Sequence, residues 1–597
     1  MNAPDQTEEV RDLLDAGDLA AAYDAAMSTI EDGADVPRLR YLAVLALARM
    51  GATEQAREAY ASLSVAEIGD ADALALDARL LKDEAFAAAP AERPQALRRA
   101  AQAYRAVWEE TGDPFPAANA ATLLLLAGDE VAALRIAGRL LAHPALKQPA
   151  SYYDAATLAE MLLLLANRSE AEGALRQAVA LPGADPGARA TTRRQLVRLC
   201  AALELSGQAT AALLAPLAPG TVIHFCGRMF AADAATEADL RTRIDRELAE
   251  RSVIAGYGAL ACGADILVAE ALLRRGAELH VILASSPQAF AATSVLPGGA
   301  DWRPRYEACL AVARSLRVVG DDSYADDPSS FGFSTEVAMG LAATRARNLG
   351  ADLHQLAIDG DRAQAAGDGP AGTQADIAAW RSAGRQTTLI EAGRLPAVAA
   401  APKQPAPPQS LAARRAVSLL FSDFARFTGL AENELPRFWE EVLGAAAGAL
   451  DCAAGAVIYR NTWGDAVFAA FTDPLSAAEA ALAMQERIAS AWPAPVGGGM
   501  RISLHHGLAF VGNDPVLHRA SVYGREVSRA ARIEPITPPG TIYVSEIFAA
   551  AVNAHAAHPF RFGYLGRLAL PKRFGVERLY RLTRQTSVQA PSSASSM

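Results

Sequence analysis

Hydrophobic and polar positions follow three different patterns along the 597-residue chain. Over residues 1–215 the pattern indicates pairs of helices joined by short turns. From residue 218 to about 395, short apolar runs alternate with helix-like segments, which is typical of a doubly wound parallel sheet. Residues 412–584 contain further apolar strands, helices and a hairpin-like end. We therefore expect a multidomain protein with an all-α helical repeat, an α/β domain and an α+β domain.

The helical part contains an internal repeat. Gly17 and Gly51 lie 34 residues apart within similar stretches, which is the tetratricopeptide period, and glycine is the residue that most often closes a helix. The turns near Gly128 and Asn167 show the same pattern and lie 39 residues apart. We predict a degenerate tetratricopeptide-like array, with an ordinary helical bundle as the alternative. In either case we expect it to bind a protein partner.

Composition narrows the class of protein. The net charge of −11 argues against general nucleic-acid binding, although a local site for an anionic ligand is compatible with it. The five cysteines are scattered and show no metal-binding spacing, which suggests reduced thiols and no zinc site. The N-terminus is polar and acidic, and no uncharged apolar run reaches membrane-spanning length. We expect a cytoplasmic protein that contacts neither membrane nor nucleic acid.

Two segments separate or follow the folded parts. Residues 396–411 are rich in proline and alanine and predict a linker, and residues 585–597 are rich in serine and predict a disordered tail. In the region between residues 218 and 395, the predicted strands are residues 221–227, 252–258, 278–283, 316–319 and 353–358, with a helix over 264–275.

A glycine-rich turn, residues 256–265, joins the second of these strands to the helix that follows it. Such a turn lets backbone amides approach a phosphate, although it lacks the full dinucleotide-binding pattern. The end of the first strand at 227–228 and the segment 372–373 before the final helix should converge on the same edge of the sheet. The arrangement resembles the Rossmann-like SLOG superfamily, which implies a nucleotide-like ligand. The candidate ligand residues are Gly227, Arg228, Gly258, Gly263, Asp265, Glu270, Gly372 and Thr373.

Two of these candidates have an equally simple structural interpretation. Glu270 is either a ribose contact or catalytic acid, or a solvated residue on a helix face. Arg228 either grips a phosphate or pairs with a surface acid.

The C-terminal part carries two carboxylates in apolar surroundings. Asp423 follows an apolar strand, and Asp465 follows Gly464 at what we expect to be a hairpin tip. A carboxylate in such a place is costly unless a cation is near, and two together suit a pair of Mg²⁺ ions bound with nucleotide phosphates. The alternative is two unrelated aspartates in turns.

The sequence around these aspartates resembles the class III nucleotidyl cyclases, the adenylate and guanylate cyclases. The first family motif stands here as FSDFARFTGL and the second as WGDAVFAAF. Residues 501–507, 524–534 and 539–545 match later family segments, and Lys572 matches the late family lysine. The resemblance covers residues 412–584 in order and implies a ferredoxin-like α+β fold.

The resemblance also implies residue roles. Asp423, Asp465 and the Phe424 carbonyl would bind two Mg²⁺ or Mn²⁺ ions. Arg532 would stabilise charge on the α-phosphate, and Lys572 would hold the terminal phosphates. The segment Phe427-Thr428 would contribute backbone N–H groups to the phosphates. Because the family builds each site from two subunits, a single such domain implies a head-to-tail homodimer.

The chain departs from the family pattern at four positions. Ser528 replaces the asparagine that orients the ribose, Asn461 and Ser521 replace the lysine and aspartate that read adenine, and Arg426 replaces a glycine of the first motif. The glutamate that reads guanine is absent at Asn461. We therefore expect an adenylate cyclase acting on ATP, with GTP as a second substrate. Alternatives are a catalytically silent nucleotide-binding scaffold and a nucleotide-processing enzyme in the middle domain.

Overall fold

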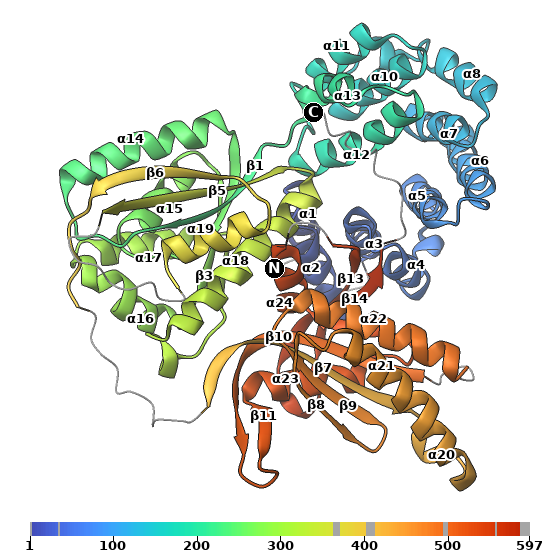
Figure 1. The fold of residues 1–597 in the computed structure, drawn as a ribbon. Coiled ribbons are helices and arrows are strands. Elements are labelled where there is room, and N and C mark those ends of the chain that lie inside the picture. The colour runs from blue at the N-terminus through green and yellow to red at the C-terminus, as the bar shows by residue number, and fades with distance from the viewer. Residues whose placement is uncertain are drawn as a thin grey trace.

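The computed structural model describes residues 3–33, 36–361, 371–400, 412–493, 499–555 and 558–585. The chain forms a helical domain, a middle domain on a parallel sheet and a C-terminal domain on a mixed sheet (Figure 1). The multidomain fold class expected from the sequence is therefore confirmed. Most of the expected linker (401–411) and the expected tail after residue 585 lie outside the described residues. Among the described helices, none is both long enough and apolar enough to cross a lipid bilayer.

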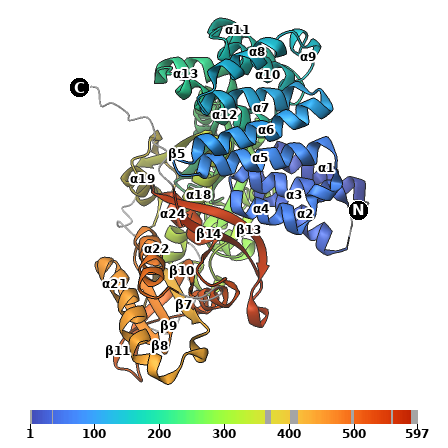
Figure 2. The ribbon, with the colours of Figure 1, turned by 90° about the vertical axis from the view of Figure 1, so that its right-hand side faces the viewer.

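The helical domain is a stack of helices in which each packs against its neighbour in sequence (Figure 2). Gly17, Gly51 and Gly128 have φ values of 75°, 75° and 84°, so the predicted glycines do end helices in the left-handed conformation. At the fourth turn Ala166 takes this conformation, with φ of 62°, beside Asn167. The helices are α1 (Ala3–Asp15), α2 (Leu19–Glu31), α3 (Pro37–Met50), α4 (Thr53–Ser62), η1 (Val65–Ile68), α5 (Ala71–Ala87), α6 (Arg93–Thr111), α7 (Pro114–Leu126), α8 (Glu130–Leu140), α9 (Pro144–Lys147), α10 (Tyr152–Leu164), α11 (Arg168–Ala178), α12 (Pro186–Ala202), α13 (Gly207–Leu214) and η2 (Ala215–Leu217).

The middle domain is built on six parallel strands in the order β4-β3-β2-β1-β5-β6. The chain moves outward from β1 in one direction and then returns to β5 on the other side, so the order reverses between β1 and β5. Ligands of doubly wound sheets bind at such a reversal, outside the carboxyl ends of the strands. The strands are β1 (Thr221–Gly227), β2 (Val253–Gly258), β3 (Glu278–Leu283), β4 (Ser315–Val318), β5 (Asp352–Asp361) and β6 (Thr387–Arg394).

Helices cover both faces of this sheet. One face is packed by α14, α15 and α17, and the other by α18 and α19. The strands expected from the sequence are present. Strands β1, β2 and β3 are buried and read as continuous apolar runs, whereas β4 is mostly exposed. The helices are α14 (Ala234–Glu250), α15 (Ala264–Arg274), α16 (Pro287–Phe290), η3 (Ala291–Val295), η4 (Leu296–Gly298), α17 (Trp302–Val312), η5 (Asp322–Tyr324), α18 (Pro328–Leu349) and α19 (Thr373–Ser382).

The C-terminal domain has a sheet in the order β13-β14-β12-β10-β7-β9-β8, with β11 paired to β10. All pairs are antiparallel except β10 with β12. The central strands β7 and β10 are long and largely buried, which fixes their register. The strands are β7 (Ala413–Ala425), β8 (Val457–Trp463), β9 (Ala466–Phe471), β10 (Gly499–Asp514), β11 (Arg519–Tyr523), β12 (Ile542–Ser545), β13 (Phe560–Ala569) and β14 (Val576–Arg584).

Helices α21, α22 and α24 share one apolar core with this sheet, and α23 packs against β10. The helices of the domain are η6 (Phe427–Gly429), η7 (Glu432–Glu434), α20 (Leu435–Phe438), η8 (Trp439–Leu443), α21 (Gly444–Cys452), α22 (Pro474–Ala491), α23 (Arg525–Ile533), η9 (Glu534–Ile536), α24 (Glu546–Ala554) and η10 (Pro571–Arg573).

The three domains are held together by close packing and by ion pairs. Helix α18 lies against α24, and it approaches so closely that a Cβ at Gly340 would overlap the carbonyl oxygen of Ala550. Arg345 of α18 pairs with Glu278 at 2.8 Å and also donates to backbone carbonyls that follow α1. Asp24 of α2 pairs with Arg578 of β14 at 2.8 Å. Each pair of domains therefore shares a direct contact.

Candidate functional site

Two strand ends bring Asp423 and Asp465 together in the C-terminal domain. Asp423 lies near the end of β7, and Asp465 lies in the tight turn between β8 and β9, which pairs with β7. Gly464 has φ of 62° in this turn, where glycine carries no steric cost. The hairpin expected from the sequence is therefore present, and it aims the second carboxylate at the first.

The two carboxyl groups interact directly. Burial, and then the negative charge of Asp423, raise the pKa of the Asp465 carboxyl. The backbone N–H groups of Asp465 and Phe424 donate to this carboxyl and oppose the rise. Like charges held this close favour a bound cation, which would relieve their repulsion.

A guanidinium and a third carboxyl complete this cluster. Arg501 of β10 lies opposite Asp423 in the ladder and donates to its carboxylate at 2.8 Å. Arg501 also lies 3.3 Å from the carboxylate of Glu534, which follows α23. Burial, and then the charge of Asp423, raise the pKa of Glu534 to about 7. Neither residue was singled out from the sequence, because only the β7–β10 register reveals that Arg501 faces Asp423.

The carboxylates fit a divalent cation that is bound together with a nucleotide. Among the described residues there is no group of three or more His, Cys, Asp and Glu side chains arranged for a metal. Mg²⁺, however, is commonly held by one or two carboxylates, with substrate phosphates supplying further oxygens. Asp423 and Asp465 are such a pair.

The segment after Asp423 turns sharply instead of entering a long helix. Phe427 and Thr428 belong to the three-residue helix η6, and Thr428 is exposed. Arg426 precedes them with φ of 68°, a conformation that suits glycine and strains other residues. The structure therefore places Phe427 and Thr428 beside the two aspartates in sequence but gives them only one short helical turn.

The remaining candidates lie on two other elements. Arg532 and the exposed Ser528 are on α23, and the exposed Lys572 is at the tip of the β13–β14 hairpin with φ of 59°. Within the described ranges, neither Arg532 nor Lys572 forms an ion pair, and neither contacts Asp423 or Asp465. Within one chain, therefore, Asp423 and Asp465 lie together, whereas the side chains of Arg532 and Lys572 do not reach them.

The proposed base-reading positions lie on two strands that approach each other without pairing in the sheet. Asn461 is on β8 and Ser521 is on β11, and the side chain of Arg519 on β11 donates to the Asn461 carbonyl oxygen at 3.0 Å. This contact leaves the Asn461 amide N–H₂ as the group free to meet a ligand. Arg519 was not anticipated from the sequence, because its partner is on a strand 58 residues earlier.

Comparison with known families decides what this domain is. Residues 411–582 match the model of the adenylate and guanylate cyclase catalytic domain. The C-terminal domain belongs to the class III cyclase family. Residues 18–124 match the model of the tetratricopeptide repeats-sensor family, which confirms the repeat character of the helical domain. The middle domain was expected to resemble the SLOG superfamily, and no family match supports that expectation.

Solved structures of cyclases are similar to part of the chain. The adenylyl cyclase CyaB from P. aeruginosa is 19% identical, with a TM-score of 0.27, over 30% of this chain and 99% of that one. The guanylate cyclase domain of RhGC from Catenaria anguillulae, solved in complex with GTP, is 20% identical, with a TM-score of 0.25, over 29% of this chain and 97% of that one. Among curated proteins, none matches the chain.

Apart from the cyclase domain, the middle domain encloses a cavity of about 730 Å³ at the point where its strand order reverses. Its lining includes the predicted residues Gly227, Arg228, Gly258, Asp265, Gly372 and Thr373. The structure therefore brings together six of the eight ligand residues expected in this domain. Gly263 and Glu270 do not line it.

Two carboxyl groups dominate the chemistry of this cavity. Asp265 is 6% exposed, and one of its carboxylate oxygens, Oδ1, is buried without a hydrogen-bond donor among the described residues. Burial raises the pKa of Asp265 well above its usual range, and burial raises that of Asp376 to about 7. Sequence reasoning missed Asp376, which lies three residues after Thr373 on α19.

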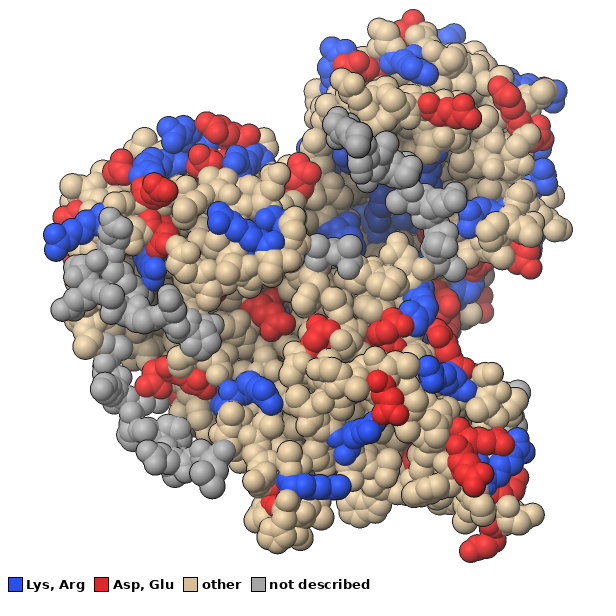
Figure 3. All heavy atoms as spheres, in the orientation of Figure 1, with Lys and Arg blue, Asp and Glu red and all other residues tan. Residues whose placement is uncertain are grey.

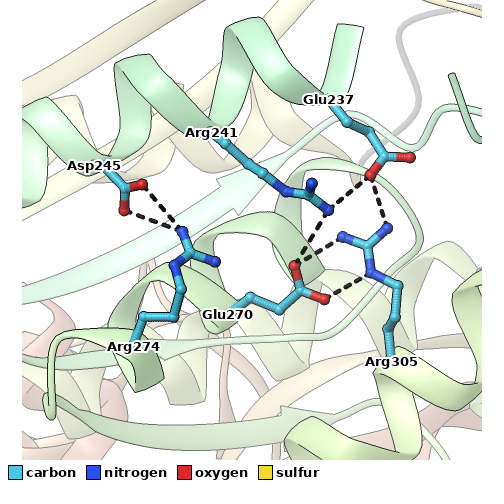
Figure 4. A network of polar contacts seen from close by, with 6 residues as sticks. All are labelled: Glu237, Arg241, Asp245, Glu270, Arg274 and Arg305. Atoms are coloured by element: carbon cyan, nitrogen blue, oxygen red, sulfur yellow. Dashed lines mark hydrogen bonds and ion pairs between the residues drawn. The ribbon is translucent and has the colours of Figure 1, made fainter. Parts of the chain in front are cut away.

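Three of the predicted residues have roles in the fold itself. Gly263 has φ of 90°, and a Cβ there would lie 2.5 Å from the Phe230 ring, so packing alone requires glycine. Arg228 pairs with the largely buried Asp359 of β5 and also lines the cavity, so this pairing does not decide between its two interpretations. Glu270 pairs with Arg305 at 2.6 Å in a network between α14, α15 and α17 (Figure 4). That network favours the structural interpretation of Glu270.

Proposed function

We propose that the protein converts ATP to cyclic AMP and pyrophosphate. The cyclase family of the C-terminal domain supports the reaction type. The observation that carries the proposal for this chain is the direct interaction of Asp423 with Asp465 at adjoining strand ends. An inactive relative has no need to keep two repelling carboxylates together, because each costs stability without a cation.

In this proposal Asp423 and Asp465 would hold two divalent metal ions, Mg²⁺ or Mn²⁺, whose positive charge would offset the charge of the phosphates. The ribose 3′ hydroxyl releases its proton to water as its oxygen attacks the α-phosphorus, and the bond from the α-phosphorus to the pyrophosphate oxygen breaks. Arg532 stabilises the charge that develops on the α-phosphate, and Lys572 binds the terminal phosphates. Positioning and charge neutralisation supply most of the rate enhancement in such phosphoryl chemistry.

We propose a head-to-tail homodimer as the active form. Arg532 and Lys572 make no ion pair in their own chain as far as the structure describes it, and neither reaches the two aspartates. A second copy related by a twofold axis would place these cations opposite the carboxylates and complete two equivalent sites.

We propose that the site prefers ATP to GTP because of how Asn461 contacts the base. With its carbonyl oxygen held by Arg519, Asn461 presents its amide donors to the base. Adenine offers N1 as an acceptor at this edge, whereas guanine offers a donor at N1 and an acceptor at O6. The amide N–H groups of Asn461 therefore match the N1 acceptor of adenine. Guanine can accept from them only at O6, and it must shift within the site to do so. We therefore expect GTP to be turned over more slowly than ATP.

The test is cyclic nucleotide synthesis by mixed variants. Full-length Asp423→Ala and Arg532→Ala proteins are assayed separately and after subunit exchange, with ATP and Mg²⁺ or Mn²⁺. Each variant alone should be inactive, and the mixture should regain up to about a quarter to a half of wild-type activity, since a mixed dimer retains one intact site. Mixing Asp423→Ala with Asp465→Ala is the matched control, because both changes affect the same half-site and no rescue is expected.

Absence of rescue despite proven subunit exchange would refute the shared site. Absence of cyclic nucleotide from the wild-type protein with either nucleotide would favour the silent scaffold instead.

A second proposal concerns the middle domain. We propose that its cavity binds a nucleotide-like ligand that donates hydrogen bonds to Asp265 and Asp376. The buried, unpartnered Oδ1 of Asp265 is the observation that favours it, because such an atom costs roughly 1–3 kcal/mol when it lacks a donor. Ribose hydroxyls are donors of this kind.

Calorimetry with nucleosides and nucleotides in metal-free buffer tests this second proposal. All proteins carry Asp465→Ala, so that the cyclase site does not contribute. Asp376→Asn should abolish binding, whereas Asp239→Asn, an exposed change on α14, should not. Binding that survives Asp376→Asn would refute the assignment.

A further inference from the structure

A second large cavity, of about 740 Å³, lies where the three domains meet. It is lined by α5 and α12 of the helical domain, by α18 of the middle domain, and by α24, β13 and β14 of the cyclase domain. Figure 3 shows a hollow between the helical domain and the rest of the molecule, with Lys and Arg side chains on its walls. We call it the junction cavity.

The junction cavity is basic, although the protein as a whole is acidic. Six of its lining residues are Arg or Lys and two are Asp or Glu. The cationic residues are Arg79, Lys82, Arg194, Arg198, Arg347 and Arg561. One of the two acids, Glu546, is already paired with Arg317 and Arg578 outside this set. The cavity therefore holds a surplus of positive charge on a chain of net charge −11.

Four of the five arginines in this set have no acidic partner in the part of the chain that the structure describes, and one of the four, Arg561, donates to the Gly51 carbonyl and to Thr53. Among the described residues, Arg194, Arg198 and Arg347 form no ion pair: Arg194 donates to the Arg49 carbonyl, Arg198 rests on the Phe86 ring, and Arg347 donates to Asn553. Burial, and then the charge of Arg79, lower the pKa of Arg194 to about 10. A bound anion would supply the missing counter-charge.

The positively charged groups and the size of the cavity favour a small phosphorylated molecule as the anion. Lys82 donates to Asn119 at 2.8 Å and to Gln195 at 3.0 Å, so its ammonium group is fixed in place. Guanidinium groups bind phosphate oxygens in pairs, and a cavity of this size is that of a small-molecule site. Phe560 and Phe562 of β13 add apolar surface to the lining.

The junction cavity is connected to the cyclase site by one hairpin. Arg561 lies at the cavity end of β13, and β13 pairs with β14 from Phe560 to Ala569. The same hairpin carries Lys572 at its far tip, beyond Ala569, and the eight extended residues that lead from Arg561 to Ala569 span roughly 27 Å. The pairing of β13 with β14 is interrupted by a register shift between Tyr564 and Gly566, and the paired stretches on either side of it would carry a shift at Arg561 toward Lys572.

We propose that the junction cavity binds a phosphorylated small molecule of nucleotide size, and that this ligand regulates the cyclase through the β13–β14 hairpin. The claim that the ligand regulates the cyclase (the regulatory half) rests on the proposed cyclase activity. The claim that the ligand binds in the junction cavity (the binding half) does not. The two can therefore fail separately.

Binding is tested by calorimetry of the full-length protein with inorganic tripolyphosphate as the probe, in metal-free buffer. All proteins carry Lys572→Ala, so that this lysine does not bind the probe. Arg194→Gln with Arg198→Gln should weaken binding at least about tenfold, because each charge-assisted hydrogen bond contributes roughly 1.5–3 kcal/mol. The matched control is Arg105→Gln with Arg176→Gln, which removes the same charge from exposed sites at 52% and 64% side-chain exposure. The control should stay within about twofold of the parent.

Arg198→Gln alone is the second variant, because Arg198 is exposed and its loss leaves the helix packing intact. It should also weaken binding severalfold. No binding by the parent, equal affinity in parent and double variant, or an equal loss in the control would each overturn the site.

The regulatory half is tested by hydrogen exchange of residues 560–584 with Lys572 intact. Tripolyphosphate should slow exchange in the hairpin of the wild-type protein and leave the Arg194→Gln, Arg198→Gln protein unchanged. Unaltered exchange in the wild-type hairpin, with binding demonstrated, would overturn the coupling.

Discussion

The charge of Glu534 should make the stability of the cyclase domain depend on pH. Glu534 faces Asp423 and Asp465 with Arg501 as the nearby cation, and its pKa is raised to about 7 from 4.5. The folded state therefore holds the Glu534 proton more tightly than the unfolded state. The contribution of Glu534 to the free energy of unfolding is fully present below about pH 4.5. It falls as the pH rises from about 4.5 to about 7, and the free energy of unfolding no longer changes through this group at higher pH.

The size of the effect follows from the shift. About 2.5 pKa units correspond to an upper limit of about 3.4 kcal/mol. The group is partly open to solvent, and screening reduces such a value, so we expect about 1–2 kcal/mol. Glu534→Gln keeps the shape and removes the charge. It should stabilise the domain by this amount at pH 8 and leave it nearly unchanged at pH 4.5.

The assay is calorimetric unfolding of wild-type and Glu534→Gln protein across pH 4.5–8.5 without divalent metal. For a domain of this size, 1 kcal/mol shifts Tm by about 2–4 °C. The matched control is Glu441→Gln, a half-exposed carboxyl that pairs with the exposed Arg437 and should show no gain at high pH. An equal Tm change for Glu534→Gln at every pH would refute the reasoning.

Four further results are expected. Arg426→Gly should stabilise the domain by about 1 kcal/mol in denaturant unfolding, since φ of 68° strains arginine, and an unchanged midpoint would count against strain there. Asp465→Ala should abolish cyclase activity while Tm is kept or raised, because it removes one of two repelling carboxylates; normal turnover would disprove the metal assignment. Asn461→Lys with Ser521→Asp should raise the ATP-over-GTP ratio of kcat/KM, and a lower ratio would show that other residues read the base. Gly340→Val should separate α18 from α24 and lower Tm markedly, because its side chain would overlap backbone; an unchanged Tm would contradict this packing.

Local sequence determined the elements of this protein. The 34-residue glycine spacing predicted the repeat turns, and apolar runs predicted strands β1, β2, β3 and β5, because burial on both faces of a sheet leaves an apolar signature in sequence. The motifs around Asp423 and Asp465 predicted the cyclase domain and its paired carboxylates. These are signals carried by residues close together in the chain.

Tertiary structure decided which charges are already satisfied and which are free. Arg501 faces Asp423 only through the β7–β10 register, and Arg228 and Glu270 are paired by acids and bases from other elements. The junction cavity joins residues as distant as Arg79 and Arg561, which no periodicity connects. Such contacts depend on how whole domains pack against one another, and the free energy of that packing is spread over many surfaces. A local pattern encodes the helix or strand, whereas the partner of each exposed charge is set only when the domains meet.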